Sequence, residues 1–170
     1  EIGCSGNINS DETKPEVGVY LNDFTWSKIS WYLSVNTQTG EGTKNTDGTT
    51  TYHVTTTIKN NLTPEEAEGL VEYITGYNSS KRDLTDMLNI VYIFAPAGGT
   101  ISNMVYTDDS GNQGSINEAT YNGRQLFTNT ASTIGGGQCT YTYDVTVSAN
   151  AVEPLGVDTT PTAQSVAGWQ

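Results

Sequence analysis

The side chains that could carry catalysis are few in this chain. Its only histidine, His53, lies between threonines in an alternating segment, where a surface position is the usual outcome. A serine hydrolase needs a histidine base beside its nucleophile, and no GxSxG motif places such a serine here. One histidine and two cysteines also fall short of a conventional zinc site. The sequence therefore predicts no enzyme, no catalytic residues and no cofactor.

Acidic residues are the remaining catalytic candidates, because a pair of carboxylates can hydrolyse a glycosidic bond. They gather, however, at an expected turn (Asp108, Asp109) and at the expected start of a helix (Glu65, Glu66, Glu68). Helix capping and solubility explain acids at such positions. Glycoside hydrolysis is therefore a weaker hypothesis than a non-catalytic function.

A calcium loop is suggested by the segment that starts at Asp108, where Ser110 and Asn112 follow at alternate positions. An EF-hand needs glycine at its sixth position and glutamate at its twelfth. Gln113 and Ala119 stand there instead. The segment predicts a hairpin turn and no metal ligands, and a looser calcium site elsewhere stays open.

Carbohydrate binding is the functional alternative that composition supports best. Three Trp and ten Tyr offer flat apolar faces to sugar rings, and many Asn, Gln and Thr offer hydrogen bonds. Trp31 shares its phase with Ile29 and Leu33, which predicts a core position. The predicted ligand-binding residues are therefore Trp26, in a short loop, and Trp169, near the end of the sequence.

Two kinds of covalent link can be considered. Cys4 and Cys139 predict one disulfide between an N-terminal arm and a late strand, in an oxidising compartment. The chain-entropy model gives such a large loop about 4–5 kcal/mol of stabilisation. Lys28 and Lys59 lie on strand-like segments and are candidates for a cross-link to Asn or Asp, but surface lysines explain them equally well.

The charge of the chain excludes several classes of partner. Its net charge is −12, from 19 acidic and 7 basic residues. Phosphate backbones and anionic lipids would both be repelled, so we predict no nucleic-acid binding and no docking on a membrane surface. No apolar run has membrane-spanning length. Because the sequence opens at Glu1 without a signal-like segment, we expect a processed protein or a piece of a longer one, with any anchor or signal outside it.

Alternation of apolar and polar residues indicates the fold class. We expect strands at 17–22, 29–37, 49–60, 87–96 and 101–107, one or two between 115 and 133, a late strand from Cys139, and a short edge strand in the tail. Thr63, Pro64 and Glu66 predict a capped helix start. The fold predicted is mainly β, a two-sheet antiparallel sandwich, Ig-like in the broad sense, with one short helix near 64–75.

The length of 170 residues fits one domain. We expect an N-terminal arm at 1–16, a β-sandwich domain at 17–158, and a C-terminal tail at 159–170 that packs on the domain.

Four segments also carry a family resemblance. VGVYLNDFTWSKISWYLS, TTTYHVTTTIKNNLT, EYITGY and NIVYIFAPAGGTISNM resemble the C-terminal region of an actinobacterial cell-surface family known as DUF4012, over roughly residues 17–150. The resemblance implies an extracytoplasmic protein tethered by an upstream membrane segment, with no established activity. It supplies no catalytic residues and does not account for the two cysteines.

The expected function is a non-catalytic extracellular structural or interaction domain of a bacterial cell-surface protein, with no direct membrane insertion. The alternative is a carbohydrate-binding module. The partners left open are a cell-wall glycan or another surface protein.

Overall fold

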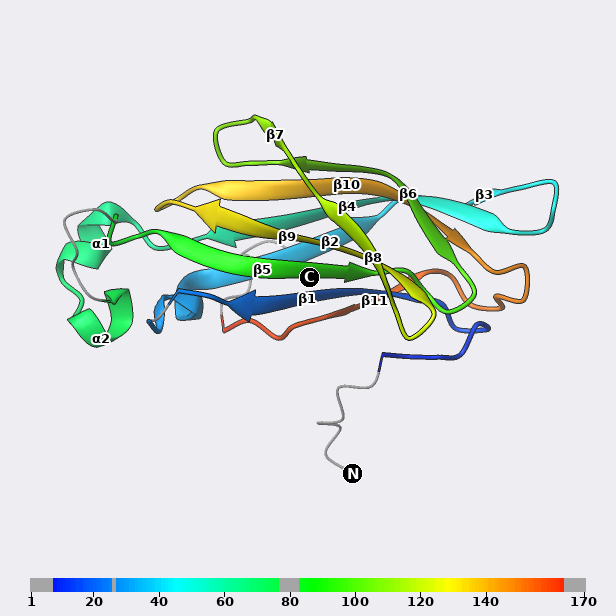
Figure 1. The fold of residues 1–170 in the computed structure, drawn as a ribbon, viewed down its shortest axis with the longest axis horizontal. Coiled ribbons are helices and arrows are strands. Elements are labelled where there is room, and N and C mark those ends of the chain that lie inside the picture. Colours follow the sequence, from blue (N-terminus) through cyan, green and yellow to red (C-terminus); the bar gives the residue numbers. More distant parts are fainter. Residues whose placement is uncertain (1–7, 26, 77–82, 164–170) are drawn as a thin grey trace, which may run out of the picture.

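Two β-sheets stacked face to face form the molecule, and the computed structural model describes residues 8–25, 27–76 and 83–163 (Figure 1). One sheet has the order β11 (Gly156–Thr159), β1 (Glu16–Asp23), β5 (Met87–Phe94), β9 (Arg124–Thr133) and β8 (Asn117–Tyr121). The other has the order β2 (Leu33–Thr39), β4 (Thr50–Asn60), β10 (Gln138–Val147), β6 (Thr100–Thr107) and β7 (Gln113–Gly114), with β3 (Thr43–Lys44) beside β4. The predicted two-sheet β-sandwich is confirmed.

The core lies between the sheets and follows the period of two that the sequence displays. In β4, Val54, Thr56 and Ile58 are buried, and in β10 Tyr141 and Tyr143 are buried opposite them. The hydroxyls of Thr56 and Tyr143 lie 3.0 Å apart and satisfy each other inside the core. Burial therefore costs these two polar groups little.

β5 is the central strand of its sheet, as its apolar sequence predicted, with β1 on one side and β9 on the other. Met87, Val91 and Ile93 face the other sheet and are each 1% exposed. Asn89 has the same inward phase and is only 3% exposed. A polar amide thus occupies a core position of the most apolar strand.

A parallel strand pair lies at the edge of the five-stranded sheet, where β11 runs beside β1 (Figure 1). Glu16 lies opposite Gly156, and Val19 lies opposite Thr159. The N–H of Thr160 donates to the Val19 carbonyl at 3.1 Å and continues the contact beyond the strand. The predicted C-terminal edge strand is confirmed, and its direction departs from a wholly antiparallel sandwich.

The predicted single helix at 64–75 is two short helices, α1 (Pro64–Glu68) and α2 (Glu72–Thr75). The capping box is confirmed: Thr63 and Glu66 exchange side-chain and backbone hydrogen bonds. The helix stops early because Gly69, a poor helix former, follows α1. The chain then turns at Val71 and starts α2 without a side-chain cap.

Cys139 is fully buried on the inward side of β10, and its thiol is free. The predicted disulfide with Cys4 is therefore not formed in the structure, and Cys4 lies outside the described residues. Cys139 pairs with Ile58 across the ladder and points between the sheets. Burial raises the pKa of its thiol to about 12, and the carboxylate of Asp109 adds to the shift.

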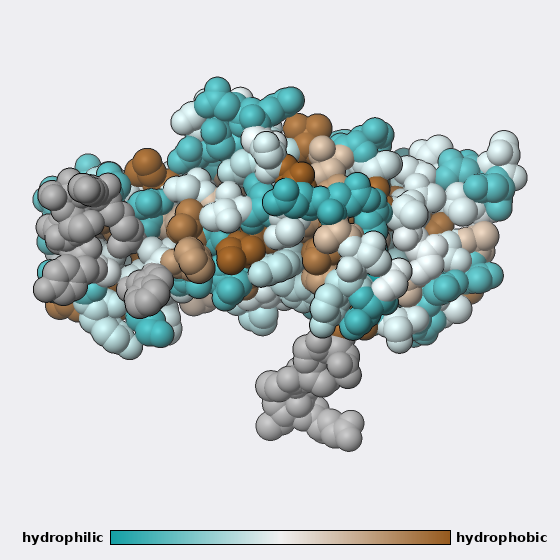
Figure 2. Space-filling view, viewed as in Figure 1, coloured by the Kyte–Doolittle hydropathy of each residue, from teal (hydrophilic) through white to brown (hydrophobic). Residues whose placement is uncertain are grey.

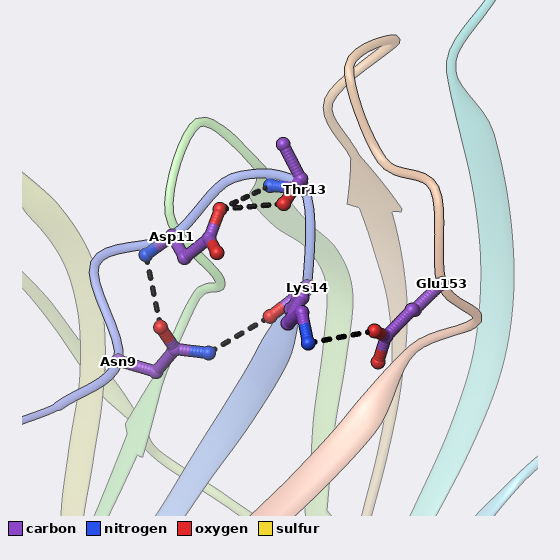
Figure 3. Close-up of polar contacts among 5 residues, drawn as sticks. All are labelled: Asn9, Asp11, Thr13, Lys14 and Glu153. Carbon is purple, nitrogen blue, oxygen red and sulfur yellow. Dashed lines mark hydrogen bonds and ion pairs between the residues drawn. The ribbon is translucent and has the colours of Figure 1, made fainter.

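Residues 8–15, which precede β1, form a hydrogen-bonded turn (Figure 3). The Asp11 carboxylate accepts from the Thr13 N–H at 2.9 Å and from its hydroxyl at 2.7 Å, which lowers the pKa of Asp11. The amide of Asn9 donates to the Lys14 carbonyl at 2.9 Å. Lys14 also pairs with Glu153 at 2.9 Å, but both side chains are exposed, so this ion pair contributes little to stability.

The surface shown in Figure 2 carries apolar side chains in small separate groups among hydrophilic ones. Figure 1 shows β5 and β8 in front on this face. No helix in the described part of the chain is long and apolar enough to cross a membrane.

Candidate functional site

The structure corrects the segment that contains Trp31. The sequence predicted one strand over 29–37, but Ile29–Tyr32 forms a 3-10 turn, η1, and β2 begins at Leu33. Ile29 is fully buried and anchors the turn, whereas Trp31 is 66% exposed. Three residues complete a 3-10 turn, so Ile29 and Tyr32 share one side and Trp31 points elsewhere. Trp31 is a surface residue and not a core residue.

The two predicted ligand-binding residues, Trp26 and Trp169, lie outside the described residues. Trp31 is therefore the tryptophan whose surroundings the structure describes. Its indole borders a groove with a volume of about 280 Å³.

The groove opens where the edges of the two sheets meet. The end of β1 and the central β5 provide one wall, and η1 with the start of β2 provides another. The chain after β11 completes it, held beside β1 by a 3.0 Å hydrogen bond from the Leu21 N–H to the Thr160 hydroxyl. Its lining residues are Leu21, Asp23, Ser30, Trp31, Leu33, Asn89, Thr160, Pro161, Thr162 and Ala163. Segments far apart in sequence thus build one site.

Asn89 is the unusual member of this lining. It is 3% exposed, and its Oδ1 is buried without a hydrogen-bond partner among the described residues. A buried polar group without a partner costs roughly 1–3 kcal/mol of stability. Such groups are rare in folded proteins and call for an explanation. A ligand in the groove would supply one.

Among the described residues that line the groove, Asp23 is the charged one and none is Lys or Arg. The Asp23 carboxylate accepts a 2.7 Å hydrogen bond from the N–H of Thr25. The Thr25 hydroxyl in turn lies 2.8 Å from the Leu88 N–H, which donates to it. This local network orients the Asp23 carboxylate, and both Asp23 and Trp31 line the groove. The groove can therefore bind a polar ligand that has an apolar face and carries no negative charge.

A second polar cluster lies on the outer face of the six-stranded sheet, around His53. Its Nδ1 lies 2.8 Å from the Asp144 carboxylate, whose other oxygen accepts from the Asn103 amide at 2.7 Å. β6 carries one extra residue here, and Asn103 adopts a positive φ of 53° within this bulge. The bulge is what turns the Asn103 side chain towards Asp144. The predicted surface position of His53 is confirmed, since it is exposed.

The His53 cluster lacks the third member of a hydrolase triad. Among the hydrogen bonds of the described residues, none joins a serine or threonine hydroxyl to His53. Within 8–25, 27–76 and 83–163, no three His, Cys, Asp or Glu side chains gather where they could hold a metal ion. The cluster thus orders the bulge and presents no nucleophile.

This cluster predicts a pH effect. Hydrogen bonds from Asn103 and His53 hold the pKa of Asp144 below its usual range. A carboxylate with a lowered folded-state pKa stabilises the fold above its unfolded value of about 4, and this contribution is lost as pH falls through the lower folded value. Replacing Asp144 with Asn should therefore flatten the acid side of a plot of melting temperature against pH. The exposed Glu41→Gln variant is the control, and an Asp144→Asn profile parallel to wild type would contradict the assignment.

No family model matches the chain. No curated protein matches it either. The resemblance to DUF4012 stays an expectation, and functional inference rests on the groove and its residues.

Sequence reasoning missed both main features of the groove. Trp31 was hidden because the alternation of Ile29, Trp31 and Leu33 continued through a turn. Asn89 had a visible signal, since it interrupts the apolar phase of Met87 and Val91. Residues 160–163 carried no sequence signal of a place in the groove, because only the tertiary fold brings them beside β1.

Proposed function

We propose that this β-sandwich is a non-catalytic, extracellular interaction module of a bacterial cell-surface protein, and that it binds carbohydrate in the groove beside Trp31. The observation that carries the proposal is Trp31, 66% exposed, at a groove where the buried Oδ1 of Asn89 has no hydrogen-bond partner among the described residues. Extracellular placement rests on the resemblance to DUF4012.

Carbohydrate suits this groove because a sugar ring is amphipathic. Its C–H face packs on an aromatic ring, while its hydroxyls need hydrogen-bond partners at the edge. Trp31 offers the ring, and Asp23, Ser30 and Asn89 offer polar groups from three different elements. The described residues of the lining include no Lys or Arg, which favours an uncharged glycan over an anionic one.

Replacing Trp31 with Ala is expected to weaken glycan binding about tenfold or more, because stacking on an aromatic side chain contributes about 1–2 kcal/mol. The side chain is exposed, so folding should be unaffected. A glycan array on the purified domain would identify a ligand, and titration calorimetry would measure its affinity for each variant.

The matched control is Tyr73→Ala, which removes an aromatic side chain 71% exposed on α2, outside the groove lining. Trp26→Ala and Trp169→Ala test the two residues that the sequence favoured. Glycan binding that survives Trp31→Ala would contradict the site. Absence of glycan binding altogether would leave a structural or protein-interaction module.

A further inference from the structure

The amide of Asn89 sets a chemical requirement on whatever occupies the groove. It is 3% exposed, lines the groove, and has an Oδ1 without a partner in the described chain. An asparagine amide has two N–H donors and a carbonyl acceptor, and its terminal torsion is soft enough to present either end. A ligand group that both donates and accepts hydrogen bonds, and that can enter a largely buried position, would satisfy it.

The neighbours of Asn89 in the groove are mainly apolar. Leu21, Leu33, Pro161 and Ala163 belong to the same lining. Leu33 is 4% exposed, so this part of the groove is close to the core. A sugar hydroxyl placed against these side chains would lose its hydration without compensation. A methyl group there would instead gain from burial.

The charge of the groove further restricts the class of ligand that can bind there. Asp23 is the charged residue of the lining, and the whole chain carries a net charge of −12. Uronates, sulfated sugars and phosphorylated sugars would meet repulsion without a compensating cation. The ligand therefore carries no negative charge.

We infer that the groove binds an N-acetylated amino sugar, an inference that rests on the proposed carbohydrate binding. The sugar ring stacks on Trp31, and the acetamido group enters beside Asn89, which hydrogen-bonds its N–H or its carbonyl. The acetamido methyl lies against Leu21, Leu33 and Pro161. One substituent thus supplies the amide partner and the apolar contact, and it adds no negative charge.

Titration calorimetry with three trimers tests the inference on the intact 170-residue chain. The ligands are the β-1,4-linked trimers of N-acetylglucosamine, of glucose and of glucosamine. The N-acetylated trimer is expected to bind about tenfold or more tightly than the glucose trimer, since one hydrogen bond and one buried methyl distinguish them. Equal affinity for the two, or tighter binding of the cationic glucosamine trimer, would overturn the inference.

Asn89→Leu separates the amide from the rest of the groove. This variant should fold, because it removes a buried Oδ1 that has no hydrogen-bond partner among the described residues. It is expected to reduce the preference for the N-acetylated trimer to about twofold or less, while Trp31→Ala weakens the glucose and N-acetylglucosamine trimers to the same extent. A preference that persists in Asn89→Leu would overturn the role of the amide.

Saturation-transfer NMR on the wild-type chain provides a readout that needs no variant. The acetamido methyl protons should receive the strongest transfer of any ligand protons. Strongest transfer at the ring protons of the reducing end would overturn the placement. Failure of all three trimers and of every glycan on an array would instead contradict the proposed function, whereas binding of the glucose trimer alone would contradict only this inference.

Discussion

Asn60→Leu is expected to destabilise the fold by about 3–5 kcal/mol, among the largest effects of any single substitution of similar volume. Asn60 is fully buried at the end of β4. Its amide donates to the Thr85 carbonyl at 2.6 Å and to the Thr133 carbonyl at 3.1 Å, and its Oδ1 accepts from the Leu62 N–H at 3.0 Å. Leucine would remove a hydrogen bond from each of three buried backbone groups.

Denaturant unfolding of wild type and Asn60→Leu measures the difference in free energy of unfolding. In thermal unfolding, the melting temperature of Asn60→Leu should be about 10 °C lower. The control is Asn117→Leu on the edge strand β8, where the side chain is exposed and the expected change is within about 0.5 kcal/mol. A small effect of Asn60→Leu would mean that the ends of β4, β9 and the segment before β5 do not depend on this amide.

The thiol of Cys139 is expected to react about a thousandfold more slowly in the folded protein than after denaturation. Its pKa is raised from 9.0 to about 12, and only the thiolate is a strong nucleophile. Full burial adds a further barrier, since a reagent must wait for an opening of the fold. The rate of alkylation, followed by mass spectrometry with and without denaturant, gives the ratio.

The Cys4→Ser variant isolates Cys139 in this measurement, because the chain has two cysteines. The same experiment tests the disulfide that the sequence predicted. Denatured wild-type protein without reductant should bind two equivalents of alkylating reagent. Incorporation of none would restore the Cys4–Cys139 disulfide, and fast labelling of folded Cys4→Ser would contradict the burial of the thiol.

The strands were predictable because their burial repeats with the period of the β-strand itself. In β10, Tyr141, Tyr143, Val145 and Val147 alternate in the sequence and are all buried in the structure. The centre of the five-stranded sheet was predictable for the same reason, since β5 is the most apolar run of the chain. Local chemistry also predicted the cap at Thr63.

The period of two led to a wrong prediction where a 3-10 turn has the apolar spacing of a strand. Residues 29, 31 and 33 fit a strand, but the chain needs η1 to pass from the first sheet into β2. A pattern of three positions cannot tell a 3-10 turn from the start of a strand. The error matters for the candidate site, because Trp31 lies at the groove and not in the predicted core.

The hydrogen-bond partners of two buried amides were also not predictable from the sequence. Asn60 and Asn89 both occupy inward positions of strands, yet one is fully paired and the other is not. Their partners, or the absence of them, come from loops and strands distant in sequence. The sequence can therefore indicate that an amide interrupts an apolar face, and only the fold shows which of the two amides is fully hydrogen-bonded.

The parallel pairing of β1 with β11 determines how the fold responds to force. In two parallel strands that lie side by side, the chain entering β1 and the chain leaving β11 are at opposite ends of the pair. Tension between them pulls the strands lengthwise past each other. The backbone hydrogen bonds of the pair, whose register runs from Glu16–Gly156 to Val19–Thr159, would then be loaded together. Tension along the chain would therefore load the β1–β11 pair in shear, the direction in which a strand pair resists separation best.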